Sequence, residues 1–173
     1  MAKVFLGLGS NLNDRQKILI TAINTISEKI GQVLKISPIY ESEPLYYNQQ
    51  PDFLNMAILV ETEDPPFNLL QNLQNIENEL GRVNKQKKNR ARKIDIDILF
   101  YNGRIIKSEN LKIPHPKLKE RQFVLKPLME IAPDFLYPGS GLSIKELYNQ
   151  CPDNSKVQLI KDSRSIKNNL ATL

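Results

Sequence analysis

The alternation of apolar and polar positions divides the first hundred residues into strands and helices. Four segments have the alternation or the short apolar run of a strand: 3–8, 33–40, 53–62 and 94–101. Two segments have apolar residues at helical spacing and a glycine directly after them: 13–30 and 67–80. The stretch GLGSN at 7–11 is interpreted as a tight turn that leads into the first helix.

The order β-α-β-β-α-β predicts an α+β fold, a ferredoxin-like sandwich with helices on one face of a mainly antiparallel sheet. Asn102-Gly103 predicts a hairpin that ends in a short strand around Ile105. Residues 112–138 contain five prolines and two short helical pieces, and Ser143 is placed to cap a helix over 144–149. We expect a single domain over 1–173, in which about 155–173 form a loosely held tail.

Composition and charge place the chain among globular proteins that bind an anionic partner. The apolar fraction is 40% and the charged fraction is 25%. Seven of the twelve residues at 82–93 are cationic, and the net charge is +5. Cys151 is the only cysteine, so no disulfide forms within the chain. No apolar run has the length of a signal peptide or membrane span, and we expect a cytoplasmic protein.

The segment RKIDIDILF at 92–100 carries the clearest candidate chemistry. Asp95 and Asp97 lie two apart on a predicted strand and therefore share one face, opposite the neighbouring isoleucines. Two close carboxylates repel each other, and Mg²⁺, which prefers carboxylate oxygen and substrate phosphates, would relieve that repulsion. The alternative is a solvent-facing polar stripe whose partners are the neighbouring cations.

Other positions have side chains that suit a nucleotide or a flat heterocycle. Gln74 and Glu77 share a helix face, and His115 is held between two prolines. Arg121 suits phosphate, an aromatic ring stacks on a heterocycle, and an amide such as Asn55 both donates and accepts hydrogen bonds. For each of these residues, an ordinary surface or core role is the alternative.

Together, these segments resemble the 6-hydroxymethyl-7,8-dihydropterin pyrophosphokinase family over about residues 3–140. No single motif is specific, but their joint occurrence in this order is. The matching segments are GLGSNL (7–12), YESEPL (40–45), QPDFLN (50–55), IENELGRV (76–83), RKIDIDILF (92–100), IPHPKLKERQFVL (113–125) and PLMEIAP (127–133).

The resemblance implies three groups of site residues. Asp95 and Asp97 would be the metal ligands and would hold two Mg²⁺ ions. The implied catalytic residues are these two aspartates together with Arg82 and Arg92. The residues implied around ATP are Gln74, Glu77, Arg82, Arg92, Ile98, Leu111, Lys112, His115 and Arg121. The residues implied for the pterin pocket are Ser42, Glu43, Leu45, Phe53, Asn55 and Phe123, with the pterin ring between the two phenylalanines.

The implied reaction transfers pyrophosphate from ATP to 6-hydroxymethyl-7,8-dihydropterin in folate biosynthesis, by a monomer without nucleic-acid or membrane partners. Two other classes of protein share part of this pattern. An RNA-binding module fits the fold order and the basic segment, but no RNP-like sequence is present. A sugar-nucleotide transferase that uses Asp-x-Asp for metal would need a larger nucleotide-binding domain.

The chain departs from the family pattern at three positions. Arg90 stands where the family usually has Gly or Ala, and Asn84 and Asn89 stand where many members have an arginine and an aromatic residue. Candidate substitutes for the missing cation are Lys85, Lys87, Lys88 and Arg90.

Overall fold

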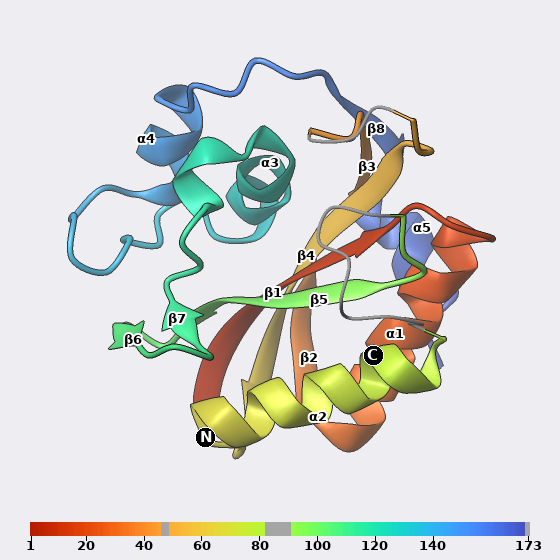
Figure 1. Ribbon diagram of the computed structural model, residues 1–173, viewed down its shortest axis with the longest axis horizontal. Coiled ribbons are helices and arrows are strands. Elements are labelled where there is room, and N and C mark those ends of the chain that lie inside the picture. Colours follow the sequence, from red (N-terminus) through yellow and green to blue (C-terminus); the bar gives the residue numbers. More distant parts are fainter. Residues whose placement is uncertain (46–48, 82–90, 172–173) are drawn as a thin grey trace.

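An antiparallel sheet forms the centre of the protein in the computed structural model, which describes residues 1–45, 49–81 and 91–171 (Figure 1). Its strands, in spatial order, are β5 (Asp95–Tyr101), β1 (Ala2–Ser10), β4 (Phe53–Thr62), β3 (Ile39–Ser42) and β8 (Val157–Lys161). β2 (Gly31–Ile36) pairs with the C-terminal half of β4, and β3 pairs with its N-terminal end. In this order β1 lies between β4 and β5 and pairs with both of them in the antiparallel direction.

Two long helices cover one face of the sheet, as expected. α1 (Arg15–Lys29) is capped by Asp14, whose side chain accepts a hydrogen bond from the Lys17 amide. α2 (Pro66–Glu79) begins at a proline and is followed by Gly81, whose φ of +91° favours glycine. Their apolar residues form one buried cluster with alternate residues of β1, β4 and β5. No helix within the described ranges has the length and hydrophobicity to cross a membrane.

The opposite face is also covered, which corrects the prediction of helices on one face only. A 3₁₀ turn η1 (Leu118–Glu120), α3 (Gln122–Ile131) and α4 (Ile144–Asn149) lie there (Figure 1). Leu125 and Leu128 of α3 are fully buried in a second apolar cluster with Phe5 and Leu99 of the sheet. The central strands are therefore buried on both faces, and their apolar residues do not reveal which helices cover each face.

Three local predictions also change in the structure. The strand expected over 33–40 is two strands, β2 and β3, because the chain bends at Ser37-Pro38. GLGSN does not form a turn, since β1 continues to Ser10. The expected hairpin is wrong as well: β6 (Ile106–Lys107) pairs with β7 (Lys112–Ile113) and not with β5.

Residues 157–167, part of the segment expected to form a loosely held tail, form a strand and a short helix in the structure. β8 pairs with β3 at the edge of the sheet, and α5 (Ser163–Lys167) follows directly. Ile166 is fully buried in the cluster beneath α1 and α2. One buried isoleucine in a polar segment gives no periodic pattern, so the sequence alone did not indicate this packing.

Candidate active site

A pocket of about 810 Å³, part of it open to solvent, lies on the sheet face that carries α3. Its floor is formed by β4, β1 and β5, and two rows of residues lie in register across these strands: Asn55–Gly9–Asp95 and Ala57–Gly7–Asp97. The pocket is therefore a groove with an amide on one side, carboxylates on the other and glycines between them.

The two glycines of β1 line the floor of the groove, and the sequence analysis did not single them out as site residues. A Cβ atom on Gly9 would lie 3.4 Å from Asn55 Oδ1, and one on Gly7 would lie 3.3 Å from the Leu99 side chain. Any larger side chain at either position would fill the floor of the groove. The sequence pattern that could have identified them is G-x-G within a strand, because residues two apart on a strand lie on the same face.

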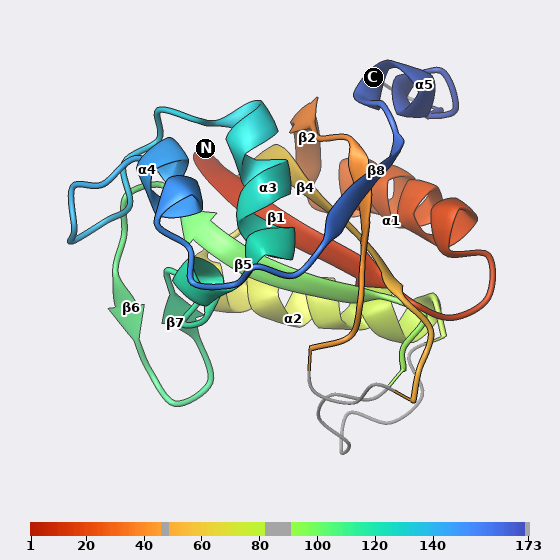
Figure 2. The same cartoon turned by 90° about the horizontal axis from the view of Figure 1, so that it is seen from above.

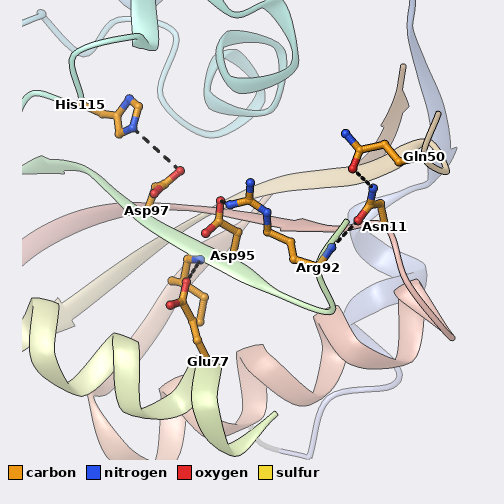
Figure 3. Close-up of polar contacts among 8 residues, drawn as sticks. Asn11, Gln50, Glu77, Arg92, Asp95, Asp97 and His115 are labelled. Carbon is orange, nitrogen blue, oxygen red and sulfur yellow. Dashed lines mark hydrogen bonds and ion pairs between the residues drawn. The ribbon is translucent and has the colours of Figure 1, made fainter. Parts of the chain in front are cut away.

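The predicted facing of Asp95 and Asp97 is confirmed. Both carboxylates line the pocket, and Ile96 and Ile98 between and after them are buried in the cluster on the other face. Arg92 Nη1 lies 2.7 Å from Asp95 Oδ2, with both side chains about three-quarters buried. Figure 3 shows the two aspartates and Arg92 on the same side of β5.

Asp97 lies where a carboxylate charge is unfavourable. The surrounding protein atoms and the charge of Asp95 raise the pKa of Asp97 to about 7, although Arg121 and Arg92 oppose them. The side chain remains 43% exposed through the pocket mouth. A cation could therefore reach this carboxylate and would stabilise its charged form.

His115 reaches the same carboxylate from the other side of the pocket. Its Nε2 lies 3.9 Å from Asp97 Oδ2 (Figure 3). Burial, assisted by the charge of Arg121, lowers the pKa of His115 to about 4, so the ring is neutral at pH 7. Because Nδ1 accepts a hydrogen bond from the Lys117 amide, Nε2 carries the proton and faces the site as a donor.

All six residues expected around a pterin line this one pocket: Ser42, Glu43, Leu45, Phe53, Asn55 and Phe123. Asn55 is 6% exposed, and its Nδ2 donates a 2.8 Å hydrogen bond to Ser42 Oγ. This bond fixes the orientation of the amide in the pocket. Phe53 comes from β4 and Phe123 from the first turn of α3, so aromatic rings enter the pocket from two different elements.

Glu77 lies on the helix side of β5, away from the pocket (Figure 3). It is 2% exposed, and its Oε1 accepts a 2.7 Å hydrogen bond from the Ile96 amide. β5 is the edge strand of the sheet in the described part of the chain, so no strand described on its outer side accepts this hydrogen bond. Glu77 therefore supports the segment between Asp95 and Asp97. Gln74 lies one turn earlier on α2 and does not line the pocket.

Other residues expected near ATP are placed apart from the pocket lining. Ile98 and Leu111 are buried in the cluster beneath α1 and α2, so a ligand at the pocket could meet only their backbone. Lys112 is exposed on β7. Arg82 lies outside the described residues, as do the departures and the candidate substitutes: Asn84, Lys85, Lys87, Lys88, Asn89 and Arg90.

Asn11 is a second kind of residue that the sequence reasoning missed. It is 1% exposed and joins three segments that lie far apart in the sequence (Figure 3). Its Oδ1 accepts from the Arg92 amide at 2.7 Å, and its Nδ2 donates to Gln50 Oε1 and to the Pro51 carbonyl. Asn11 thus holds the backbone of Arg92 against the pterin side of the pocket.

The donor set suits a metal that is completed by its substrate. No group of three or more His, Cys, Asp or Glu residues placed to hold a metal ion occurs in the described part of the chain. Mg²⁺ is typically held by one or two carboxylates, with waters and phosphates as the remaining ligands. Asp95 and Asp97 fit that arrangement.

Comparisons with known proteins find relatives over most of the chain. The family model of 7,8-dihydro-6-hydroxymethylpterin-pyrophosphokinase matches residues 5–133. The 2-amino-4-hydroxy-6-hydroxymethyldihydropteridine pyrophosphokinase of Haemophilus influenzae is 41% identical over 160 residues, which cover 92% of this chain and 99% of that protein.

Longer relatives match as well. The folic acid synthesis protein fol1 of Pneumocystis carinii is 48% identical over 151 residues, and the match covers 87% of this chain. The chain spans about a fifth of the length of that relative, since 20% of it is matched. A crystal structure of Plasmodium falciparum HPPK-DHPS shares the fold, with a TM-score of 0.70 and 18% identity over 86% of this chain and 44% of that one. The chain belongs to the 7,8-dihydro-6-hydroxymethylpterin-pyrophosphokinase family.

Proposed function

We propose that this chain transfers a pyrophosphoryl group from ATP to the hydroxymethyl group of 6-hydroxymethyl-7,8-dihydropterin, in folate biosynthesis. The observation that carries the proposal is the row Asn55–Gly9–Asp95 across the pocket floor. A pterin held at Asn55 would have its hydroxymethyl arm over the glycine, directed at phosphates beside the aspartates. Asn55 and Asp95 are two strand spacings apart, about 9.6 Å, which leaves room for that arm.

The reaction is an in-line displacement at phosphorus. The pterin hydroxyl oxygen attacks the β-phosphorus of ATP, and the bond from that phosphorus to the oxygen bridging the α-phosphate breaks. The hydroxyl proton passes to water, and the products are AMP and the pterin diphosphate. The proposal assigns no described residue of the site as general base, because Asp97 would be a metal ligand, so positioning and electrostatic stabilisation are proposed to supply most of the acceleration.

Asp95 and Asp97 would hold the metal, which we take to be two Mg²⁺ ions bound together with ATP. When bound, Mg²⁺ neutralises charge on the phosphate oxygens. The raised pKa of Asp97 supports this role, because a carboxylate in that environment gains from a nearby cation. Glu77 holds the backbone between the two aspartates, so that their carboxylates stay on one face.

The pterin residues would select a flat ring with donors and acceptors on its edge. Phe53 and Phe123 would stack on the two ring faces. Asn55, oriented by Ser42, would read the ring edge, because an amide offers both a donor and an acceptor. Glu43 and Leu45 lie at the same end of the pocket and would close its outer wall.

The nucleotide residues would bind phosphates from the side facing the aspartates. Arg92, already paired with Asp95, and Arg121 at the N-terminus of α3 both line the pocket. His115 would donate from Nε2 to a phosphate oxygen. Arg82, Gln74, Ile98, Leu111 and Lys112 are proposed to complete the ATP site around them. We further propose that the chain acts as a cytoplasmic monomer.

The test is product analysis with ATP, Mg²⁺ and 6-hydroxymethyl-7,8-dihydropterin. AMP should appear in step with pterin diphosphate. Release of ADP, or no turnover by well-folded protein, would overturn the proposal.

A matched pair of variants tests the role of the carboxylate. Asp97→Ala should lower kcat by at least about 100-fold, since a lost electrostatic group in such a site has this effect. Asp134→Ala, on an exposed loop after α3, should leave kcat unchanged. Equal rates for the two variants would show that Asp97 is not a metal ligand.

A further inference from the structure

The segment after α4, together with the start of β8 that follows it, contacts both sides of the pocket. Residues 150–156, here called the connecting segment, lead from α4 to β8. In Figure 2 this segment passes the end of α3 at which that helix begins, and then continues into β8 beside β3. It lies beyond residue 133, where the match to the family model ends.

The first contact is at the N-terminus of α3. Asp153 Oδ2 accepts a 2.9 Å hydrogen bond from the Gln122 amide, and its Oδ1 accepts one from the Ser155 amide. α3 has no cap of its own, because the Arg121 side chain makes no capping hydrogen bond and its first turn holds no acid. A carboxylate 31 residues further along the chain therefore satisfies this helix end.

The charge on Asp153 is stable in this position. Burial raises the pKa of its carboxyl, but hydrogen bonds from Ser155 and Gln122 outweigh burial and hold the pKa below its usual value. The residue is thus a carboxylate at neutral pH, which is the form that interacts best with the partial positive charge of a helix N-terminus.

The capped turn carries pocket residues. Arg121, Phe123 and Val124 flank the capped amide of Gln122, and all three line the pocket. The Arg121 guanidinium lies 5.6 Å from the centre of the Phe123 ring, so the two side chains form one unit. A shift of this turn would move the aromatic face and the cation together.

The second contact is at the opposite wall. Val157 and Gln158 of β8 pair with Ser42 and Glu41 of β3. Ser42 is the residue that orients Asn55 by accepting its hydrogen bond. The chain from Asp153 to Gln158 therefore spans the distance between the wall that carries Asn55 and the turn that carries Phe123.

We propose that Asp153 is a positioning residue that sets the separation of the two pterin-binding walls by anchoring the first turn of α3. This proposal rests on the proposed function. It assigns to the segment after residue 133 a direct effect on pterin affinity. Loss of the anchor would leave the ligands themselves to order the turn, so affinity for the pterin would fall, and with it the share of ATP affinity that Arg121 contributes, while Asp95 and Asp97 keep their positions on β5.

The test compares steady-state kinetics of Asp153→Ala with those of wild type at saturating ATP and Mg²⁺. The KM for the pterin should rise about fivefold, the factor expected for loss of a helix cap, while kcat stays within about twofold. Asp153→Asn keeps one acceptor oxygen and loses the charge, so its KM for the pterin should lie between those of wild type and Asp153→Ala. Faster hydrogen exchange of the Gln122 amide in Asp153→Ala would report the released turn directly.

The matched control is Asp162→Ala. Asp162 caps α5 by accepting from the Ser165 amide at 2.8 Å, and it lies on the exposed surface away from the pocket. Its removal should lower Tm, as a lost cap does, and leave the pterin KM unchanged.

The outcomes separate the two proposals. If wild type releases no pterin-dependent AMP, the proposed function fails. If wild type is active and both Asp153 variants keep the wild-type pterin KM, the positioning role is refuted. An equal rise in KM for Asp162→Ala would also refute it, because general destabilisation would then explain the effect.

Discussion

Replacement of Asn11 gives the sharpest test of how the site is held together. The side chain is 1% exposed and makes three hydrogen bonds, with the Arg92 amide, Gln50 Oε1 and the Pro51 carbonyl, at 2.7, 3.1 and 3.0 Å. Each such bond contributes about 1 kcal/mol net, so Asn11→Ala should lower the free energy of unfolding by about 3 kcal/mol. For a chain of this size, this corresponds to a fall in Tm of about 6–12 °C.

Urea unfolding measures this change, with Asn75→Ala as the matched control. Asn75 lies on the exposed face of α2, and its side chain accepts one hydrogen bond, from Gln71. Its replacement should change the free energy of unfolding by less than about 0.5 kcal/mol. Asn11→Asp keeps the acceptor for the Arg92 amide but turns a carboxylate oxygen toward the Pro51 carbonyl. It should destabilise the protein at least as much as Asn11→Ala.

Turnover should fall together with stability, because Asn11 connects the backbone of Arg92 to the pterin side of the pocket. If Asn11→Ala lowers the free energy of unfolding by less than about 1 kcal/mol, the reasoning is refuted, because buried groups that lose their hydrogen-bond partner should cost more than that. Full stability in Asn11→Asp would equally show that the amide donors are not needed.

Three further predictions concern the histidine, the pocket floor and the C-terminal residues. NMR titration of His115, the only histidine, should give a pKa near 4, and a value near 6.5 would contradict its burial. Because the pKa of His115 is depressed in the folded protein, this residue lowers the free energy of unfolding as pH falls from 6.5 to 4. The raised pKa of Asp97 increases the free energy of unfolding as pH falls from about 7, so the two effects partly cancel and the titration of His115 is the better measurement. Gly9→Ala should raise the pterin KM without lowering Tm, because its Cβ would lie 3.4 Å from Asn55 Oδ1; an unchanged KM would exclude Gly9 from the floor. Ile166→Ala should cost about 2–5 kcal/mol in urea unfolding, whereas Ile160→Ala, 36% exposed on β8, should not; equal effects would refute the burial of Ile166.

The sequence by itself determined the features that depend on local period. Alternation over 94–101 was enough to place Asp95 and Asp97 on one face and the isoleucines on the other, because side chains on a strand have a period of two. Helical spacing and the flanking Pro65 and Gly81 likewise located α2 within a residue or two. The resemblance of these segments then indicated the pterin pyrophosphokinase family, and the family match confirms that the chain belongs to it.

Only the tertiary structure decided which segments meet. Glu77 is buried against an edge amide of β5, Asn11 joins Arg92 to Pro51, and Asp153 caps a helix that begins 31 residues earlier. Each of these contacts satisfies a backbone group that a distant part of the chain exposes, and no local pattern records that need. Polar side chains that satisfy such groups look like surface residues in a sequence, because their partners exist only after the sheet has assembled.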